Sequence, residues 1–237
     1  MSQDVIYKRI GRPDAALVAR ARACAMSDLY EALDAARRDS ALMRSSVRPL
    51  ATGVRIAGPA VTARCAPRDN LMMHRALALA EAGDVLVVEA QAPSGAQWGM
   101  LAAVYAEEKK LAGVVVDGCI RDADNLRERR YPVWYTEISP AHPTKQGRGS
   151  VNVPIVCGGV EVRPGDVICA DGDGVLVLRA IELATAVARA EARGKREHED
   201  IATIKAGHSL LEIHDLARPL AASGVCEVDG IWDPRKK

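Results

Sequence analysis

The sequence predicts an α/β fold whose first half has parallel strands, followed by a β-rich segment and a helical C-terminal extension. Between about residues 54 and 136, short apolar runs alternate with segments of helical spacing, a pattern typical of buried parallel strands joined by helices. Between residues 151 and 178, short apolar runs are separated by glycine-containing turns that leave no room for helices. From residue 181 to about residue 205 the chain is rich in Ala, Glu and Arg, a composition that favours helix.

The composition is that of a soluble globular protein with an aliphatic core. The 237 residues are 49% hydrophobic and 27% charged, contain no Phe, and carry a formal charge of +1. Basic residues do not cluster and aromatic residues are few, so we do not expect nucleic acid as a ligand. The chain shows no signal-peptide pattern and no apolar stretch near the roughly 18 residues of a spanning helix, so we expect a cytoplasmic protein without a membrane span.

The cysteines are spread along the chain without a C-x-x-C pair, and most lie in apolar runs. We therefore expect reduced thiols in the core rather than a disulfide or zinc framework. The six positions are Cys24, Cys65, Cys119, Cys157, Cys169 and Cys226.

The first predicted elements are a helix, an interrupted strand and a second helix. Residues 13–38 begin with Pro-Asp and have leucines near helical spacing. Residues 54–63 are rich in Val and Ala and predict a strand that is broken by a Gly-Pro bend. An Asp-Asn pair at the start of residues 69–80 predicts a capped helix.

The next segment predicts alternating strands and helices. The apolar runs 85–88, 113–116 and 133–136 predict buried strands. A helix is expected from about residue 98 to residue 110, and a shorter one follows the second strand. This order favours a parallel sheet.

The last third of the chain predicts a loop, a hairpin and a helix. Residues 139–150 are rich in Pro, Gly, Ser and Lys and predict a long loop. The Asp-Gly-Asp-Gly sequence at residues 171–174 resembles the start of a calcium loop but lacks the closing Glu, so we interpret it as a tight hairpin turn. Residues 181–205 predict a charged helix or helix pair, and residues 223–237 an arm.

Residues 97–101 form the first candidate site. The sequence Gln-Trp-Gly-Met-Leu stands at a predicted helix start, where free backbone N–H groups and a glycine suit a carboxylate. The alternative is a helix-entry turn in which Trp98 packs into the core.

Arg121 and Asp122 form the second candidate site, directly after a predicted buried strand. An arginine fork binds a carboxylate or an enolate oxygen, and an aspartate supplies a hard oxygen ligand for Mg²⁺ or Mn²⁺. The alternative is a surface ion pair in which Asp122 caps the following helix. The two residues by themselves leave both interpretations open.

Other catalytic signatures are missing from the sequence. It contains no G-x-S-x-G elbow, P-loop, H-E-x-x-H or G-x-G-x-x-G motif. The histidines share no ligand spacing, so we interpret each as a surface or packing residue. They are His74, His142, His198, His208 and His214.

Several motifs taken together resemble the RraA-like superfamily over about residues 10–215. Gly-Ser-Val-Asn-Val-Pro at residues 149–154 and the long charged C-terminal helix favour one branch, the 4-hydroxy-4-methyl-2-oxoglutarate / 4-carboxy-4-hydroxy-2-oxoadipate aldolases, over the shorter ribonuclease regulators. The remaining motifs are Gly58-Pro59-Ala60-Val61-Thr62, Asp69-Asn70, residues 83–88, Gly99-Met100-Leu101, residues 117–122, Pro164-Gly165-Asp166 and residues 171–175.

This resemblance implies a fold, an assembly and an activity. The fold is a single domain over residues 1–237, a compact layered sandwich with its core at about 10–180 and an extension at 181–237. The assembly is a homotrimer or hexamer. The activity is class II, metal-dependent cleavage of a 4-hydroxy-2-oxo dicarboxylic or tricarboxylic acid, which releases pyruvate and a second oxo acid in aromatic-compound degradation. An oxaloacetate decarboxylase side activity is also implied.

The resemblance also implies roles for individual residues. Asp122 corresponds to the ligand of Mg²⁺ or Mn²⁺, and Arg121 to a catalytic arginine that binds substrate. Glu197 corresponds to an acidic residue that acts at the site from a neighbouring subunit.

The predicted helix start contains one departure from the family pattern. Gly99, Leu101 and Ala102 correspond to backbone amides that hold the carboxylate of pyruvate. The residue between them is usually Asp or Glu and orients a water for proton transfer, whereas Met100 cannot accept a proton. Either another acid takes the place of the usual Asp or Glu, or this protein has a different substrate or catalyses a different reaction. The candidates for that acid are Glu107, Glu197 and Glu199.

Two alternative functions stay open. One is another metal-dependent lyase or decarboxylase on the same scaffold, which Met100 favours. The other is a non-catalytic, RraA-type regulator of RNA processing.

Overall fold

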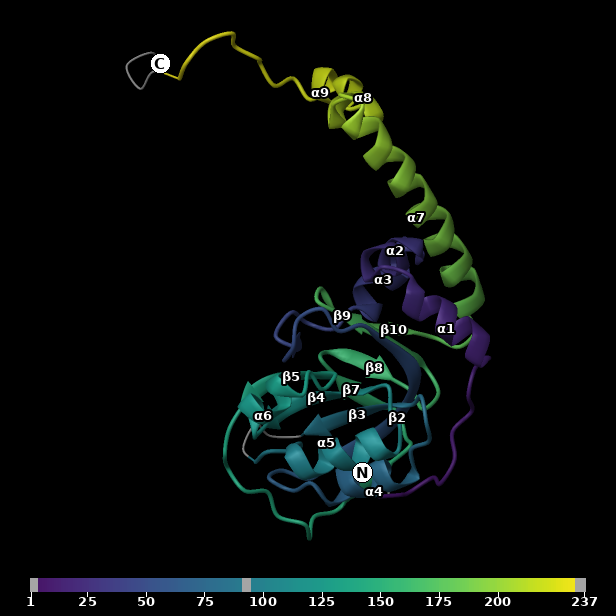
Figure 1. Ribbon diagram of the computed structural model, residues 1–237, viewed down its shortest axis with the longest axis vertical. Helices are drawn as coiled ribbons and strands as arrows, with labels where there is room; N and C mark the ends of the chain where they lie inside the picture. Colours follow the sequence, from purple (N-terminus) through teal and green to yellow (C-terminus); the bar gives the residue numbers. More distant parts are fainter. Residues whose placement is uncertain (1–3, 91–94, 233–237) are drawn as a thin grey trace. The chain divides into compact units, whose positions relative to one another are not determined.

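The computed structural model describes residues 4–90 and 95–232. Contacts divide the chain into two compact units, Met1–Ala192 and Arg193–Lys237. The predicted α/β fold is confirmed in the first unit, where helices pack on a large mixed sheet (Figure 1).

The sheet has the strand order β1-β5-β4-β3-β2-β9-β10, with β6 paired to β2. Its centre is parallel, because β2 pairs with β3, β3 with β4, and β4 with β5 in the same direction. A separate antiparallel pair is formed by β7 and β8. The strands are β1 (Arg48–Pro49), β2 (Ile56–Cys65), β3 (Val85–Ala90), β4 (Gly113–Ile120), β5 (Val133–Ile138), β6 (Gly149–Val151), β7 (Ile155–Cys157), β8 (Val160–Val162), β9 (Val167–Asp171) and β10 (Gly174–Leu178).

The helices of the first unit pack on this sheet. Side chains of α4 and α5 join those of the parallel strands in one apolar cluster, and side chains of α2 and the first part of α7 join β9 and β10 in another. The helices in chain order are α1 (Ala15–Ala23), α2 (Met26–Ala32), α3 (Ala35–Ala41), α4 (Leu71–Leu79), α5 (Met100–Glu108), α6 (Ala123–Glu128) and α7 (Leu183–Lys205).

The prediction of one helix over residues 13–38 is wrong. The backbone is extended at Cys24 and again at Leu33, which separates α1, α2 and α3. Residues from all three helices are buried in the cluster with β9 and β10. One straight helix presents a single apolar stripe, so the breaks let this segment bury more than one face.

The predicted break of the first long strand at Gly58 and Pro59 is also wrong, because β2 is continuous through both. The strand changes partner there: residues 56–59 pair with β9, and residues 60–65 pair with β3. A Cβ at Gly58 would lie 2.2 Å from the carbonyl oxygen of Gly83, so glycine is required by close packing and not by a bend.

The predicted hairpin at residues 171–174 is confirmed, since Gly174 pairs with Asp171 across the turn between β9 and β10. The predicted reduced core thiols are confirmed for the five cysteines that are buried, while Cys226 is exposed.

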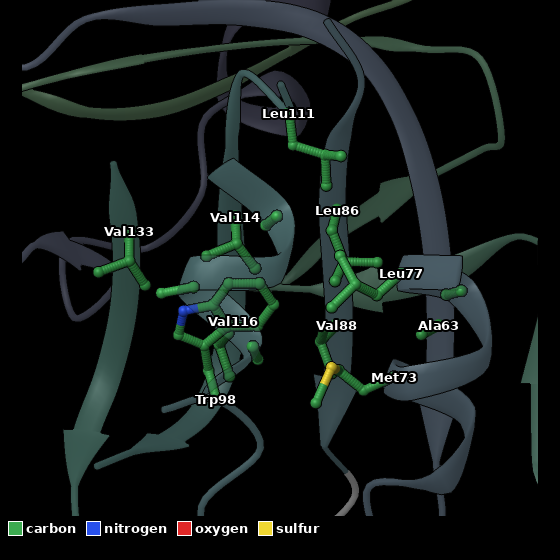
Figure 2. Packing of buried hydrophobic residues seen from close by; sticks show 14 of the residues in the cluster. Ala63, Met73, Leu77, Leu86, Val88, Trp98, Leu111, Val114, Val116 and Val133 are labelled. Carbon is green, nitrogen blue, oxygen red and sulfur yellow. The ribbon is translucent and has the colours of Figure 1, made fainter. Parts of the chain in front are cut away.

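Figure 2 shows the apolar core around Trp98, next to the first candidate segment at residues 97–101. Trp98 lies among Val114, Val116 and Val133 of the parallel strands, and Met73 and Leu77 of α4 cover Leu86 and Val88. Trp98 is nearly inaccessible to solvent and stacks on Tyr131 with ring centroids 5.8 Å apart. The residues next to Trp98 are therefore fixed by a rigid core.

The second unit contains the later turns of α7 and two short helices, α8 (Leu210–Ile213) and α9 (Ala217–Ala222). Ser209 and Glu212 form a capping box at the start of α8. Among the described residues, no helix combines the length and apolar character that a membrane-spanning segment requires.

Candidate active site

The two candidate segments predicted from the sequence lie together. Trp98 forms a parallel bridge with Ile120 at the end of β4, and the Arg121 N–H donates to the Trp98 carbonyl at 2.9 Å. The chain that leads into α5 is therefore fixed alongside the chain that leaves β4. This places Gly99 beside Asp122.

Asp122 does not act as the side-chain cap of α6. It has a left-handed backbone with φ 57°, and its side chain makes no capping bond. Its Oδ2 instead accepts from the Met100 N–H at 2.9 Å, at the start of α5. A left-handed backbone is unfavourable for most non-glycine residues but is tolerated by Asp.

Gly99 is required by the close approach of this carboxylate. A Cβ at residue 99 would lie 2.8 Å from Asp122 Oδ2, 3.0 Å from Arg121 Cγ and 3.1 Å from Arg121 Nε. The backbone of Gly99 is extended, so the requirement comes from space and not from φ.

The start of α5 offers backbone donors. The first N–H groups of a helix have no acceptor within the helix, and the Met100 N–H already donates to Asp122. Those of Leu101 and Ala102 have no acceptor in the part of the chain that the structure describes. This supports the predicted carboxylate-binding role of Leu101 and Ala102 and gives Met100 a different one.

Arg121 and Asp122 are partly exposed and are not engaged in a tight ion pair. The Arg121 Nε lies 3.8 Å from Asp122 Oδ2, and each side chain is 38% exposed. A cavity of about 120 Å³ is lined by Gly99, Leu101, Ala102 and Arg121. The arginine is thus available to a ligand in that cavity.

The donor set at Asp122 fits a hard divalent cation. Within residues 4–90 and 95–232, no three His, Cys, Asp or Glu side chains converge to form a metal cage. Mg²⁺ is usually bound by one or two carboxylates and keeps several waters, so a single half-exposed carboxylate with Oδ2 bonded to one N–H suits Mg²⁺ or Mn²⁺ better than zinc.

Two of the acids considered as replacements for Met100 lie on α7, in the second unit. Glu197 and Glu199 are exposed there, and the predicted role of Glu197 in a neighbouring subunit stays a prediction. Glu107 is not a good replacement, because both of its oxygens pair with Arg129, at 3.3 and 2.5 Å. It also lies seven residues along α5 from Met100, or about 10 Å at the usual helical rise.

Sequence reasoning missed another wall of the cavity. Asn70 and His74 come from the start of α4, and Pro143 and Lys145 come from the loop after β5. The Asp-Asn pair indicated a helix cap and the loop indicated a polar connection, so neither pattern indicated a shared cavity. Burial and the charge of Lys145 lower the pKa of His74.

Asp69 holds the loop that carries Lys145. Its Oδ2 accepts from Thr144 Oγ1 at 2.6 Å and from the N–H groups of Gln146 and Gly147 at 2.7 and 2.8 Å. Burial alone would raise the pKa of Asp69, but these bonds and one from the Leu71 N–H outweigh it and lower the pKa. The predicted cap is thus made by Asp69 rather than by Asn70.

Comparisons with known proteins show to which family the chain belongs. A Halalkalibacterium halodurans protein provisionally named 4-hydroxy-4-methyl-2-oxoglutarate aldolase is 39% identical over 137 residues, which is 57% of this chain and 65% of that protein, slightly under two thirds of its length. The crystal structure of Streptomyces coelicolor RraAS2, described as an unusual member of the RNase ES inhibitor RraA family, is 29% identical with a TM-score of 0.70, covering 84% of this chain and 100% of that one.

A Pseudomonas syringae protein of known structure shares the fold, with a TM-score of 0.78 at 24% identity over 88% of this chain and 97% of that chain. The sequence profile described as RraA-like, Aldolase/RraA, matches residues 26–177. That range contains the whole Gly99–Asp122 arrangement. The chain belongs to the RraA-like family.

Proposed function

We propose that this protein is a divalent-metal-dependent lyase that cleaves a 4-hydroxy-2-oxo dicarboxylic or tricarboxylic acid into pyruvate and a second oxo acid. The observation that carries the proposal is that Arg121 and the open start of α5 share one wall of a cavity, while the Asp122 carboxylate is bonded to the Met100 N–H at that same helix start. The name of the H. halodurans relative supports the same reaction class.

The residues of the site bind the substrate and stabilise the negative charge that develops on it. The N–H groups of Leu101 and Ala102 bind the substrate carboxylate at the start of α5. Arg121 donates to the 2-oxo oxygen, where negative charge develops as the bond breaks. Asp122 would hold Mg²⁺ or Mn²⁺, which when bound supplies Lewis-acid polarisation of that carbonyl.

The cleavage breaks the C3–C4 bond. The 4-hydroxyl loses its proton and becomes the carbonyl of the second product, and the electron pair of the broken bond moves to C3. Protonation of C3 then completes pyruvate. Met100 cannot take the hydroxyl proton, and Glu107 is paired with Arg129. Of Glu197 and Glu199, Glu197 is the one that corresponds to the acidic residue of the aldolases, so we assign this proton transfer to Glu197 of a neighbouring copy in a homotrimer or hexamer.

The test is pyruvate release from 4-hydroxy-4-methyl-2-oxoglutarate, followed in a coupled assay with Mg²⁺, with Mn²⁺ and with a chelator. Asp122→Asn should lower kcat/KM by roughly 100-fold or more, because it removes the charged oxygen ligand. Asp124→Asn is the matched control, since Asp124 lies two residues away with a side chain that is 92% exposed. Full metal-dependent activity of Asp122→Asn would contradict the proposal.

Glu197→Gln tests the assigned proton transfer separately. It should lower kcat while leaving pyruvate binding nearly unchanged, and sedimentation should show a trimer or hexamer. Full activity of Glu197→Gln, or a monomer that is fully active, would remove Glu197 from the mechanism and leave the metal-dependent reaction standing.

The second candidate is a regulator of RNA processing without catalysis, which the name of the S. coelicolor structure favours. It predicts that wild-type protein releases no pyruvate with any metal and that it inhibits a ribonuclease. A third candidate, favoured by Met100, is another lyase or decarboxylase at the same site. It predicts that oxaloacetate decarboxylation exceeds cleavage of the hydroxy acid.

A further inference from the structure

The cavity beside Arg121 has a second polar wall that the cleavage steps do not use. Asn70 and His74 reach it from the start of α4, and Lys145 reaches it from the loop after β5. These residues come from segments far apart in sequence from the β4–α6 loop that supplies Arg121.

The charges around the cavity suit a ligand with two anionic groups. Arg121 and Lys145 both line it, and the described residues of its lining include no acid. In the described part of the chain Lys145 forms no ion pair, and Asp69, which anchors its loop, already accepts from Thr144 and from backbone donors. A single substrate carboxylate at the start of α5 would leave Lys145 without a partner.

Two buried amide oxygens of residues that line the cavity lack hydrogen-bond donors. Asn70 is 5% exposed and Gln97 is 0% exposed, and neither Asn70 Oδ1 nor Gln97 Oε1 has a partner within the described residues. Their nitrogens are directed to the carbonyls of Gln97 and Gly95, so the oxygens remain to accept. Buried acceptors are normally satisfied, and a ligand hydroxyl supplies the missing donor.

The backbone of the loop that carries Lys145 is anchored by Asp69. Asp69 accepts three hydrogen bonds from residues 144–147 of its loop. A Cβ at Gly147 would lie 2.6 Å from Asp69 Cγ, so this anchor is tightly packed. The loop therefore does not have to become ordered when a ligand binds.

We infer that Lys145, with His74 beside it, binds the distal carboxylate of the substrate, and that Asn70 Oδ1 accepts from its 4-hydroxyl in the bound complex, before Glu197 of the neighbouring copy takes that proton. Lys145 is then the residue that selects hydroxylated oxo-dicarboxylic acids over oxo-monocarboxylic acids. The inference rests on the proposed function for the identity of the substrate, but not for the existence of the two-anion site.

The test compares two ligands that differ in one group. 2-Oxoglutarate has a distal carboxylate where 2-oxopentanoate has a methyl, and the protein cleaves neither under the proposed reaction. Calorimetric titration in the presence of Mg²⁺ should show that Lys145→Met weakens 2-oxoglutarate binding by about 10-fold or more and changes 2-oxopentanoate binding less than about twofold. Lys145→Arg should recover most of the difference.

Arg148→Met is the matched control, because Arg148 lies on the same loop with an exposed side chain paired to Asp4. It should bind both ligands as the wild type does. Asn70→Ala should bind 2-oxoglutarate normally but lower cleavage of 4-hydroxy-4-methyl-2-oxoglutarate, after thermal unfolding shows that the variant is folded. Normal cleavage by folded Asn70→Ala would overturn the hydroxyl contact.

Equal weakening of both ligands by Lys145→Met, or no weakening of either, would overturn the subsite. The failure of the proposed function has a different signature. In that case the wild type discriminates the two ligands through Lys145 but releases no pyruvate from 4-hydroxy-4-methyl-2-oxoglutarate.

Discussion

Gly99→Ala should disable the candidate site without unfolding the protein. The added methyl would lie 2.8 Å from Asp122 Oδ2, about 0.6 Å inside the roughly 3.4 Å at which atoms begin ordinary contact. The same methyl would lie 3.0 Å from Arg121 Cγ and 3.1 Å from Arg121 Nε, so Arg121 leaves it no space on the other side. The Asp122 carboxylate must therefore move away from the start of α5.

A displacement of this size changes rates more than stability. A misplacement of about 1 Å in a catalytic group can lower a rate about 100-fold, so we expect kcat/KM to fall about 10- to 100-fold, or about 1.4 to 2.7 kcal/mol in transition-state stabilisation. The free energy of unfolding should change by no more than about 1 kcal/mol, because the extended backbone of Gly99 suits alanine.

The assay is pyruvate release with saturating Mg²⁺, with chemical unfolding measured on the same samples. Gly172→Ala is the matched control, since a Cβ at Gly172 meets nothing within 4 Å. Unchanged kcat/KM in Gly99→Ala, or an equal loss in Gly172→Ala, would refute the geometric reasoning.

Three further predictions concern charges around the core and the cavity. Arg12→Ala should lower the free energy of unfolding, measured by urea titration, by about 2–3 kcal/mol, because it leaves the buried Asp84 without its bidentate partner. The control is Arg9→Ala, at an exposed position, whose free energy of unfolding should stay within about 0.5 kcal/mol of the wild-type value. Asp69→Asn should destabilise the protein by about 1.5–3 kcal/mol at pH 7. Since the folded pKa of Asp69 is lowered, the stability it contributes is present above the unfolded pKa of about 3.9 and lost as the pH falls through the folded value. Unfolding midpoints at pH 7 and pH 3 should show that loss in the wild type, with exposed Asp173→Asn as control; a pH-independent difference would contradict the assignment. Lys145→Met should raise the pKa of His74 toward its usual value, because the ammonium group disfavours the imidazolium. The measurement is a proton NMR titration of His74 with Arg148→Met as the control, and the same His74 pKa in both variants would contradict this prediction.

The sequence by itself determined the alternating elements of the first unit. The apolar runs at 85–88, 113–116 and 133–136 lie within β3, β4 and β5, because burial on both faces of a parallel sheet requires uninterrupted hydrophobic residues. The tight turn at residues 171–174 was likewise readable, since its glycines and aspartates specify a local conformation.

Tertiary packing decided the elements that the sequence misassigned. A Gly-Pro pair usually ends a strand, but in β2 the neighbouring strands change at that point and the lack of a side chain at Gly58 admits the carbonyl of Gly83. The three helices of residues 15–41 follow the surface formed by β9 and β10, which local spacing does not encode.

For the candidate site, the sequence identified Gly99, Arg121 and Asp122 and left a helix cap as an alternative for Asp122. The bond from the Met100 N–H to Asp122, across 22 positions of sequence, excludes the side-chain cap. Local sequence does not show this, because only folding brings the start of α5 to the end of β4, and the metal-binding role of Asp122 stays our proposal. The same reason explains why Asn70 and Lys145 were not recognised as partners: they share a cavity but no local pattern, and their proximity is a property of the packed chain.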